Sequence, residues 1–285
     1  MTNRLPSWVR SRLPSAADVA EISSWTYKKG LATVCQEARC PNRGDCFHRR
    51  TATFLLLGPT CTRNCRFCAV EHGPPSHAPA DEPLRVASSV KALGLQFAVI
   101  TSVTRDDLPD GGAGVFAETI GAIRRHCPSA GVEALVPDFQ GSEEALRVVV
   151  DAYPDVLSHN LETVPRLYPQ LRQGASYERS LELLERAREW APKMLTKSGI
   201  MVGVGETFDE VLALVSDLVR VGCHALTIGQ YLQPTILHHP VEKYLHPDEF
   251  EELKSLAMAR GMSKVVAGPL VRSSFHAGEI MGHTS

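Results

Sequence analysis

Short apolar runs alternate with amphipathic stretches along most of this chain. The apolar runs are rich in β-branched and aromatic residues, and each is too short for a typical helix. They predict strands at residues 52–57, 97–103, 132–137, 156–159, 195–204 and 226–231. The stretches between them carry apolar residues at helical spacing and predict helices at residues 84–93, 114–126, 143–152, 177–190, 208–221 and 247–260.

Strands that alternate with helices form βαβ units around a parallel sheet. The predicted strands are apolar at most positions, as strands are when both faces of a sheet are covered. Six units predict an α/β fold of the TIM type, a partial (β/α)6 barrel instead of a full eight. Functional residues of such barrels lie at the C-terminal ends of the strands, and the predicted strands end in polar residues.

The two ends of the chain depart from this repeating pattern. Residues 1–50 contain turn-forming residues and three cysteines, with one short helix predicted at residues 16–24. We interpret residues 1–50 as an N-terminal extension, residues 51–260 as the barrel and residues 261–285 as a C-terminal segment. Both end segments are expected to cover the barrel mouth.

Charge and hydropathy exclude several classes of protein. The formal net charge is −2 over 285 residues, and no block of like charge marks a nucleic-acid-binding face. No apolar run reaches the ~20 residues that a membrane-spanning helix needs. The N-terminus lacks the apolar region of a secretory signal. We therefore expect a soluble, cytoplasmic enzyme with no nucleic-acid or membrane partner.

Six of the eight cysteines form two close triplets. The first triplet has the spacing C-x4-C-x5-C and consists of Cys35, Cys40 and Cys46. The second has the spacing C-x3-C-x2-C and consists of Cys61, Cys65 and Cys68. In a reducing compartment such cysteines bind metals or act in catalysis more often than they form disulfides. Closed zinc sites and electron-carrying clusters usually take four protein ligands, so two three-thiolate sites indicate two iron–sulfur clusters with one open iron each.

The second triplet directly follows the first predicted barrel strand and includes Phe67. Its three thiolates can hold three corners of a 4Fe–4S cluster, which leaves the fourth iron for a molecule with an amine and a carboxylate. S-adenosylmethionine (SAM) has both groups, and an electron from the cluster could cleave its sulfonium bond to give a carbon radical. The alternatives are a zinc knuckle with a distant fourth ligand and a set of redox thiols.

The C-x3-C-x-Phe-C arrangement resembles that of the radical SAM superfamily, whose members share a partial barrel. The glycine-rich residues 199–206 resemble the strand end that holds SAM in these proteins, since glycine allows a ligand to approach the backbone closely. With the first triplet ahead of the second, the chain is similar to the lipoyl synthase family. The resemblance covers residues 33–279 and rests on TVCQEARCPNRGDC, TATFLLLG, CTRNCRFCAV, TSVTRDDLPDGGA, SHNLETVPRLY, TKSGIMVGVGE, LTIGQYLQPT and GPLVRSSFHAGE.

This resemblance implies an activity and a division of labour between the triplets. The cluster on the second triplet would cleave SAM to a 5′-deoxyadenosyl radical, which removes hydrogens from carbons 6 and 8 of an octanoyl chain. The chain is attached to a lysine of a carrier, such as the glycine-cleavage H protein or a lipoyl domain of a 2-oxoacid dehydrogenase. The cluster on the first triplet would donate the sulfur atoms. A reductant such as ferredoxin or flavodoxin and an iron–sulfur carrier are further implied partners.

The resemblance also implies site residues. The fourth ligand of the first cluster in the family is a serine of an Arg-Ser-Ser-Tyr motif, which here reads Arg272-Ser273-Ser274-Phe275. We assign this ligand to Ser274, with Ser273 as the second choice, although from the residues alone both would be helix N-caps. The residues expected to bind SAM or line the acyl site, each otherwise a satisfied turn residue, are Thr101, Ser102, Asn160, Glu162, Lys197, Gly203, Gly205 and Glu206.

Some interpretations stay open at this point. The arginines near the cysteines, among them Arg63 and Arg66, either compensate cluster charge or are solvated surface residues. Three histidines are interpreted as structural or surface residues: His238, His239 and His246. The alternative functions are another radical SAM sulfur-transferring enzyme, such as a methylthiotransferase or a biotin-synthase-like protein, and an electron carrier. An electron carrier would have four-cysteine sets and a small fold, and a methylthiotransferase would have a different auxiliary cysteine pattern.

Overall fold

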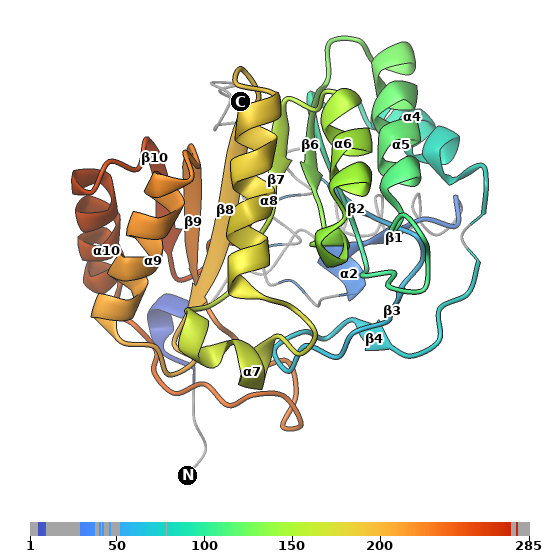
Figure 1. Ribbon diagram of the computed structural model, residues 1–285. Helices are drawn as coiled ribbons and strands as arrows, with labels where there is room; N and C mark the ends of the chain where they lie inside the picture. The colour runs from blue at the N-terminus through green and yellow to red at the C-terminus, as the bar shows by residue number, and fades with distance from the viewer. Residues whose placement is uncertain are drawn as a thin grey trace.

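A curved, mostly parallel sheet with helices packed along one face forms the centre of the molecule (Figure 1). The computed structural model describes residues 5–9, 29–37, 40, 42, 46, 52–77, 79–274 and 278. The strands of the main sheet are β1 (Ala32–Thr33), β2 (Thr53–Leu56), β5 (Phe97–Ser102), β6 (Gly131–Leu135), β7 (Val156–Ser158), β8 (Leu195–Val202), β9 (Ala225–Gln230) and β10 (Lys264–Gly268). A separate pair consists of β3 (Thr60–Cys61) and β4 (Glu71–His72).

The helices follow the strands along the chain. The longer ones are α4 (Glu82–Ala92), α5 (Ala113–His126), α6 (Glu143–Asp151), α8 (Tyr177–Trp190), α9 (Phe208–Arg220) and α10 (Pro247–Ala259). The short ones are η1 (Ser7–Val9), α2 (Val34–Glu37), η2 (Phe139–Gly141), η3 (Pro165–Leu167) and α7 (Tyr168–Leu171). Side chains at their first turns hold several of these helices in place. The clearest case is α9, where Thr207 and Glu210 form a reciprocal capping box.

The main sheet follows the order β1-β2-β5-β6-β7-β8-β9-β10. Every pairing from β2 to β10 is parallel, and only β1 runs antiparallel to its neighbour. Within the described residues the two outer strands do not pair with each other, so the sheet is an open, partial barrel. The parallel strands point their carboxyl ends toward one edge, which places the loops after them together at one mouth.

All six predicted strands and all six long helices are confirmed, with small differences at their ends. The prediction omitted β10, a further parallel strand that pairs with β9. Only Val265 of its five residues is fully buried, so this edge strand carries little of the apolar signal that identified the others. The short strands β1, β3 and β4 were omitted for a similar reason. The predicted helix at residues 16–24 lies outside the described residues.

Two features of the main sheet bring the ends of the chain to the barrel. β1 precedes the barrel and pairs with β2, with Thr33 opposite Phe54. β10 follows α10 and extends the sheet beyond residue 260, and the chain then turns back at Val271, whose amide donates to the Gly268 carbonyl at 3.1 Å. The division of the chain into an extension, a barrel and a C-terminal segment stays a prediction.

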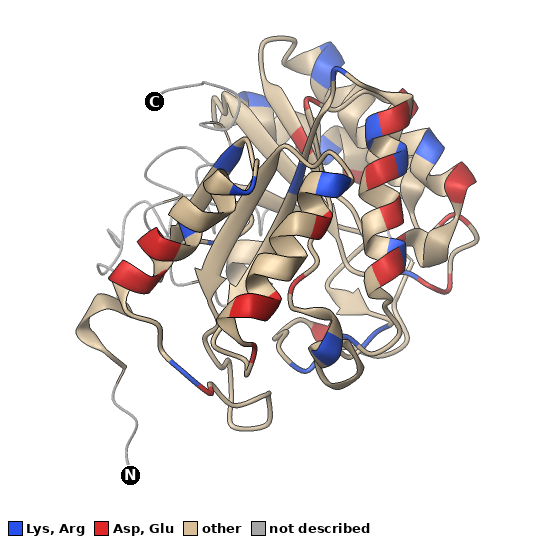
Figure 2. Cartoon of the chain, turned by 60° about the vertical axis from the view of Figure 1, so that its left-hand side comes forward, with Lys and Arg blue, Asp and Glu red and all other residues tan. Residues whose placement is uncertain are grey.

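Acidic and basic residues alternate along the outward helices, so neither sign dominates the face in Figure 2. None of the helices in the described ranges combines the length and the apolar character needed to cross a membrane.

Candidate active site

A cavity of about 300 Å³ lies at the barrel mouth and is walled by loops from both ends of the chain. All three cysteines of the second triplet line it, together with four of the polar residues predicted from strand ends: Thr101, Ser102, Asn160 and Glu162. Val34 of α2 and Ser273 of the C-terminal segment also face this cavity. The structure therefore brings the second triplet, the strand ends and both end segments to one place.

The loop of the second triplet is tied to several neighbouring loops by its backbone. Cys61 ends β3, and its carbonyl accepts from the Gly73 amide at 3.0 Å, which closes the base of the loop beside β4. The amide of Thr62 donates to the Thr104 carbonyl at 3.0 Å, and the amide of Arg66 donates to the Leu171 carbonyl at 3.1 Å. These bonds hold the loop against the segments after β5 and within α7.

Two histidines predicted to be structural hold the far side of the same loop. His238 Nε2 lies 3.0 Å from the Cys68 carbonyl, and the His239 amide donates to the Arg66 carbonyl at 2.9 Å. The third, His246, caps α10. The segment after β9 therefore braces the second triplet.

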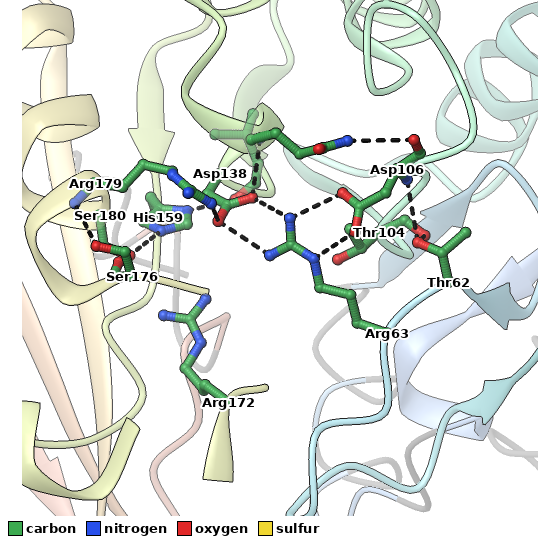
Figure 3. A network of polar contacts seen from close by, with 12 residues as sticks. Thr62, Arg63, Thr104, Asp106, Asp138, His159, Arg172, Ser176, Arg179 and Ser180 are labelled. Atoms are coloured by element: carbon green, nitrogen blue, oxygen red, sulfur yellow. Dashed lines mark hydrogen bonds and ion pairs between the residues drawn. The ribbon is translucent and has the colours of Figure 1, made fainter. Parts of the chain in front are cut away.

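Arg63, inside the second triplet, lies between two acidic residues from adjacent strand ends (Figure 3). Its guanidinium donates to both oxygens of Asp106 at 2.6 and 2.8 Å, and to both oxygens of Asp138 at 3.0 and 2.8 Å. Arg179 reaches Asp138 as well, at 3.1 Å. Bidentate arginine–carboxylate pairs fix orientation as well as distance. Of the two interpretations of Arg63, solvated surface and charge compensation, the first is wrong, since only 8% of its side chain is exposed.

Charge balance in this network shows which form each group takes. Burial alone would raise the pKa of Asp138, but the hydrogen bonds from Arg63 outweigh it and lower that pKa to about 2. Burial would lower the pKa of Arg63, but the two carboxylates raise it above its ordinary value. Arg63 and Asp138 are therefore ionised at neutral pH, and the positive charge of Arg63 is already paired with carboxylates.

Two thiols of the second triplet, those of Cys65 and Cys68, are buried enough to stay protonated on their own. Burial raises the pKa of Cys65 to about 11, although the nearby Arg172 guanidinium opposes this, and it raises the pKa of Cys68 to about 12. The thiolate is the form that binds metal, so cluster binding and loss of these protons are coupled. Within the described ranges, no three Cys, His, Asp or Glu side chains converge as ligands of a single ion.

Two predicted ligand-binding residues carry polar atoms that fit a bound molecule. Ser102 Oγ and Asn160 Oδ1 are buried beside the cavity and have no hydrogen-bond partner in the described structure. Unpaired buried polar atoms are costly, so they mark places where a ligand is expected. Gly199 lies next to them, and a Cβ there would approach Asn160 Oδ1 to 2.8 Å. The residues present therefore fit a polar cofactor such as SAM beside the three thiols.

Glu162 and Arg172 form the charged wall of the same cavity. Glu162 has a left-handed backbone (φ +65°), which is strained for a residue other than glycine. Burial raises its pKa, although Arg172 and a 3.0 Å hydrogen bond from Asn160 oppose this. Arg172 donates to the Asn160 carbonyl at 3.0 Å and to the Tyr168 hydroxyl at 2.9 Å. Arg172 was not predicted from the sequence, because it follows the short helix α7 and not the end of a strand.

The other predicted cofactor residues are not part of the cavity wall. Glu206 accepts from the Gly203 and Val204 amides at 2.6 and 2.9 Å and so closes its own turn. Gly203 has φ +94°, and a Cβ there would collide with Gln230 and with the Lys243 carbonyl. Gly205 is likewise left-handed, with φ +105°. These residues shape the loop after β8, and Lys197 lies below the cavity in the barrel interior, fully buried.

The first triplet lies beside the C-terminal segment that contains the predicted serine ligand. Cys35 is buried in α2, and its carbonyl accepts from the Cys40 amide at 3.2 Å. The side chain of Asn42, between Cys40 and Cys46, donates to the Leu270 carbonyl. Burial lowers the pKa of Arg272, and this guanidinium lies close enough to Cys40 for their charges to interact. The Asn42–Leu270 contact places parts of the two end segments side by side, and the role of Ser274 as a ligand stays a prediction.

Residues 55–218 match the model of the radical SAM superfamily. Over 274 residues the chain is 53% identical to the lipoyl synthase of Rubrobacter xylanophilus, covering 96% of this chain and 85% of that protein. It is 52% identical to the lipoyl synthase of Caldanaerobacter subterraneus subsp. tengcongensis, covering 97% of each.

Solved structures resemble the chain in fold at low identity. SuiB of Streptococcus suis bound to S-adenosylmethionine aligns with a TM-score of 0.60 and 12% identity, over 79% of this chain. The chain spans only about half (53%) of that structure. HydG, a maturase of the [FeFe]-hydrogenase, aligns with a TM-score of 0.59 and 14% identity, over 81% of this chain and 62% of its own. These two support the partial barrel alone.

Proposed function

Because the chain belongs to the lipoyl synthase family of the radical SAM superfamily, we propose that it inserts sulfur at carbons 6 and 8 of an octanoyl chain on a carrier-protein lysine. The observation that carries this proposal is the cavity where the three cysteines of the second triplet lie with two polar atoms that have no partner in the described structure, Ser102 Oγ and Asn160 Oδ1. When bound there, a 4Fe–4S cluster and SAM supply the radical chemistry that removes hydrogen from unactivated carbons.

The residues around the second triplet would bind and orient the cluster and SAM. Cys61, Cys65 and Cys68 would hold the cluster, and Ser102 and Asn160 would bind polar groups of SAM. The amide of Arg63 already donates to Cys61 Sγ at 3.4 Å, and such hydrogen bonds to sulfur tune the potential of a cluster. Arg172 and Glu162 would orient the charged methionine end of SAM, with Thr101 beside them.

The apolar wall excludes water from a reactive radical and accommodates the acyl chain. Its members come from four parallel strands or the residues after them, namely Leu55, Val103, Leu135, Val136, Ile200 and Met201. Gly203, Gly205, Glu206 and Lys197 would act from behind this wall, by shaping the segments that carry it.

A second cluster, on Cys35, Cys40 and Cys46 with Ser274 as the fourth ligand, would be the sulfur donor. The contact between Asn42 and Leu270, and the position of Ser273 at the cavity, support this assignment. An alkoxide is a weaker partner for iron than a thiolate is, which suits a cluster that loses its sulfur. The proposed partners are octanoylated H protein or lipoyl domains, ferredoxin or flavodoxin as reductant, and an iron–sulfur carrier in the cytoplasm.

An anaerobic assay tests this function. Reconstituted protein is mixed with dithionite, SAM and an octanoylated carrier peptide, and both deoxyadenosine and the peptide mass are measured. We expect deoxyadenosine together with a peptide that has gained two sulfur atoms. Deoxyadenosine without any sulfur-containing peptide would refute the proposal and favour a different radical SAM activity.

A further inference from the structure

A buried ion pair crosses the barrel interior beneath the cavity. Lys197 of β8 and Glu133 of β6 are both completely buried, and Lys197 Nζ lies 2.6 Å from Glu133 Oε2. Ser158, on the strand between them, donates to Glu133 Oε1 at 2.8 Å. Burying an ion pair generally costs as much as it returns, so stability alone is a poor explanation for this one.

The third contact of this lysine leads out of the barrel to the C-terminal segment. Lys197 Nζ donates to the Ser273 carbonyl at 2.8 Å. An ammonium has three hydrogens, and the two oxygens of Glu133 together with this carbonyl provide three acceptors. Lys197 therefore connects three neighbouring strands of the sheet to the residue directly before Ser274.

Two other contacts restrain the same segment from different sides. Asn42, within the first triplet, donates to the Leu270 carbonyl. Gly229 of β9 lies so close to the segment that a Cβ at this position would overlap the Val271 carbonyl oxygen. The backbone at residues 270, 271 and 273 is thus fixed by the extension, by β9 and by β8.

We infer that Lys197, oriented by Glu133, is a positioning residue that fixes Ser273 and thereby directs Ser274 toward the first triplet. The inference rests on the proposed function, in which Ser274 is the replaceable fourth ligand there. A displacement of about 1 Å at a reacting group can cost ~100-fold in rate, so a rigid backbone anchor beside this ligand has a large effect on the reaction. Lys197 would then act on sulfur insertion and not on SAM cleavage.

The double variant Glu133→Gln/Lys197→Met tests this without leaving one charge buried alone. Its matched control is Glu251→Gln/Lys254→Met, which removes an exposed pair on α10. In the protein without clusters, hydrogen–deuterium exchange at residues 269–274 should rise in the double variant and stay unchanged in the control. In the reconstituted enzyme, sulfur insertion should fall by about tenfold or more while deoxyadenosine formation stays within about twofold.

Gly229→Ala provides an independent test, because it displaces Val271 without touching the ion pair. It should likewise lower sulfur insertion while leaving SAM cleavage nearly unchanged. Equal loss of both activities in the double variant would mean that the pair only stabilises the barrel, and normal exchange with normal sulfur insertion would also overturn the inference. Ser274→Ala separates the two proposals. If Ser274→Ala still inserts sulfur, the assignment of Ser274 as a ligand is wrong. If Ser274→Ala loses sulfur insertion but the double variant keeps it, the proposed role of Lys197 is wrong.

Discussion

The two cysteine triplets are attached to the same barrel in different ways. The second triplet lies in a loop that is bonded at Thr62, Arg63, Arg66 and Cys68 to four separate segments of the mouth, including the half-buried Asp106 and the buried Asp138. The hydrogen bonds described around the first triplet include backbone bonds within its own segment and the Asn42–Leu270 link to the C-terminal segment, and Cys35 packs among apolar residues of the barrel core. One site belongs to the barrel, and the other is assembled from the two ends of the chain.

This difference matches the two proposed tasks. A cluster that cleaves SAM must keep the same geometry from one turnover to the next, and interlocked ion pairs provide that. A cluster that donates its sulfur must be taken apart and rebuilt, and a site made from separable segments allows access. We therefore expect that a substitution at the first triplet leaves the activity of the second triplet intact.

Cysteine variants should give the largest effects. Cys65→Ala should abolish both deoxyadenosine formation and sulfur insertion, because it removes a proposed cluster ligand at the cavity proposed to bind SAM. Cys40→Ala should abolish sulfur insertion only, with SAM cleavage retained. Iron content and the two products are measured in parallel after reconstitution. If Cys40→Ala also stops SAM cleavage, the two sites are not separate.

Replacing Arg63, which holds the loop of the second triplet to two carboxylates, should have the next largest effect. Arg63→Met removes the shared partner of Asp106 and the nearly inaccessible Asp138, so the free energy of unfolding should fall by about 4 kcal/mol. Denaturant unfolding of the protein without clusters measures this. Arg166→Met is the matched control, since Arg166 pairs with Glu210 on the surface and its loss should change stability far less. Equal effects of the two variants would show that the buried network does not anchor the loop.

A smaller effect on the free energy of unfolding is expected when the pH is lowered, because of His159 at the cavity wall. Burial lowers the pKa of His159 from 6.5 to about 4, and this residue lies on the cavity wall with Nδ1 2.8 Å from the Val136 carbonyl. The unfolded chain therefore binds a proton near pH 6.5 that the folded chain takes up only near pH 4. The contribution of His159 to the free energy of unfolding should be fully present above pH 6.5. It should fall by roughly 3 kcal/mol as the pH drops toward 4.

Denaturant titrations of the protein without clusters at several pH values measure this dependence. The slope between pH 6.5 and 4 should be shallower in His159→Gln than in the unchanged protein. The same slope in both proteins would show that His159 is not the group responsible.

The sequence predicts local structure well, and contacts between distant segments poorly. The alternation of apolar runs and helical stretches identified every central barrel strand, but it missed β10, where only Val265 is fully buried. Spacing alone grouped the cysteines. It could not show that Arg63 meets Asp138, 75 positions later, or that Lys197 meets Ser273, because such pairs have no local pattern. Arg172 was not predicted because it follows the short helix α7 and not the end of a strand.

The link between Asn42 and Leu270 joins residues 228 positions apart in the chain. A ribosome makes the first triplet early and the segment with Ser274 long afterwards, so nascent chains carry the first three proposed ligands while the fourth does not yet exist. Contacts this distant in sequence also form late in folding. Any chain that stops before residue 270 would keep the loop of the second triplet but could not complete the first site. Under the proposed function, the sulfur-donating site can therefore be completed only after synthesis has passed through the whole barrel.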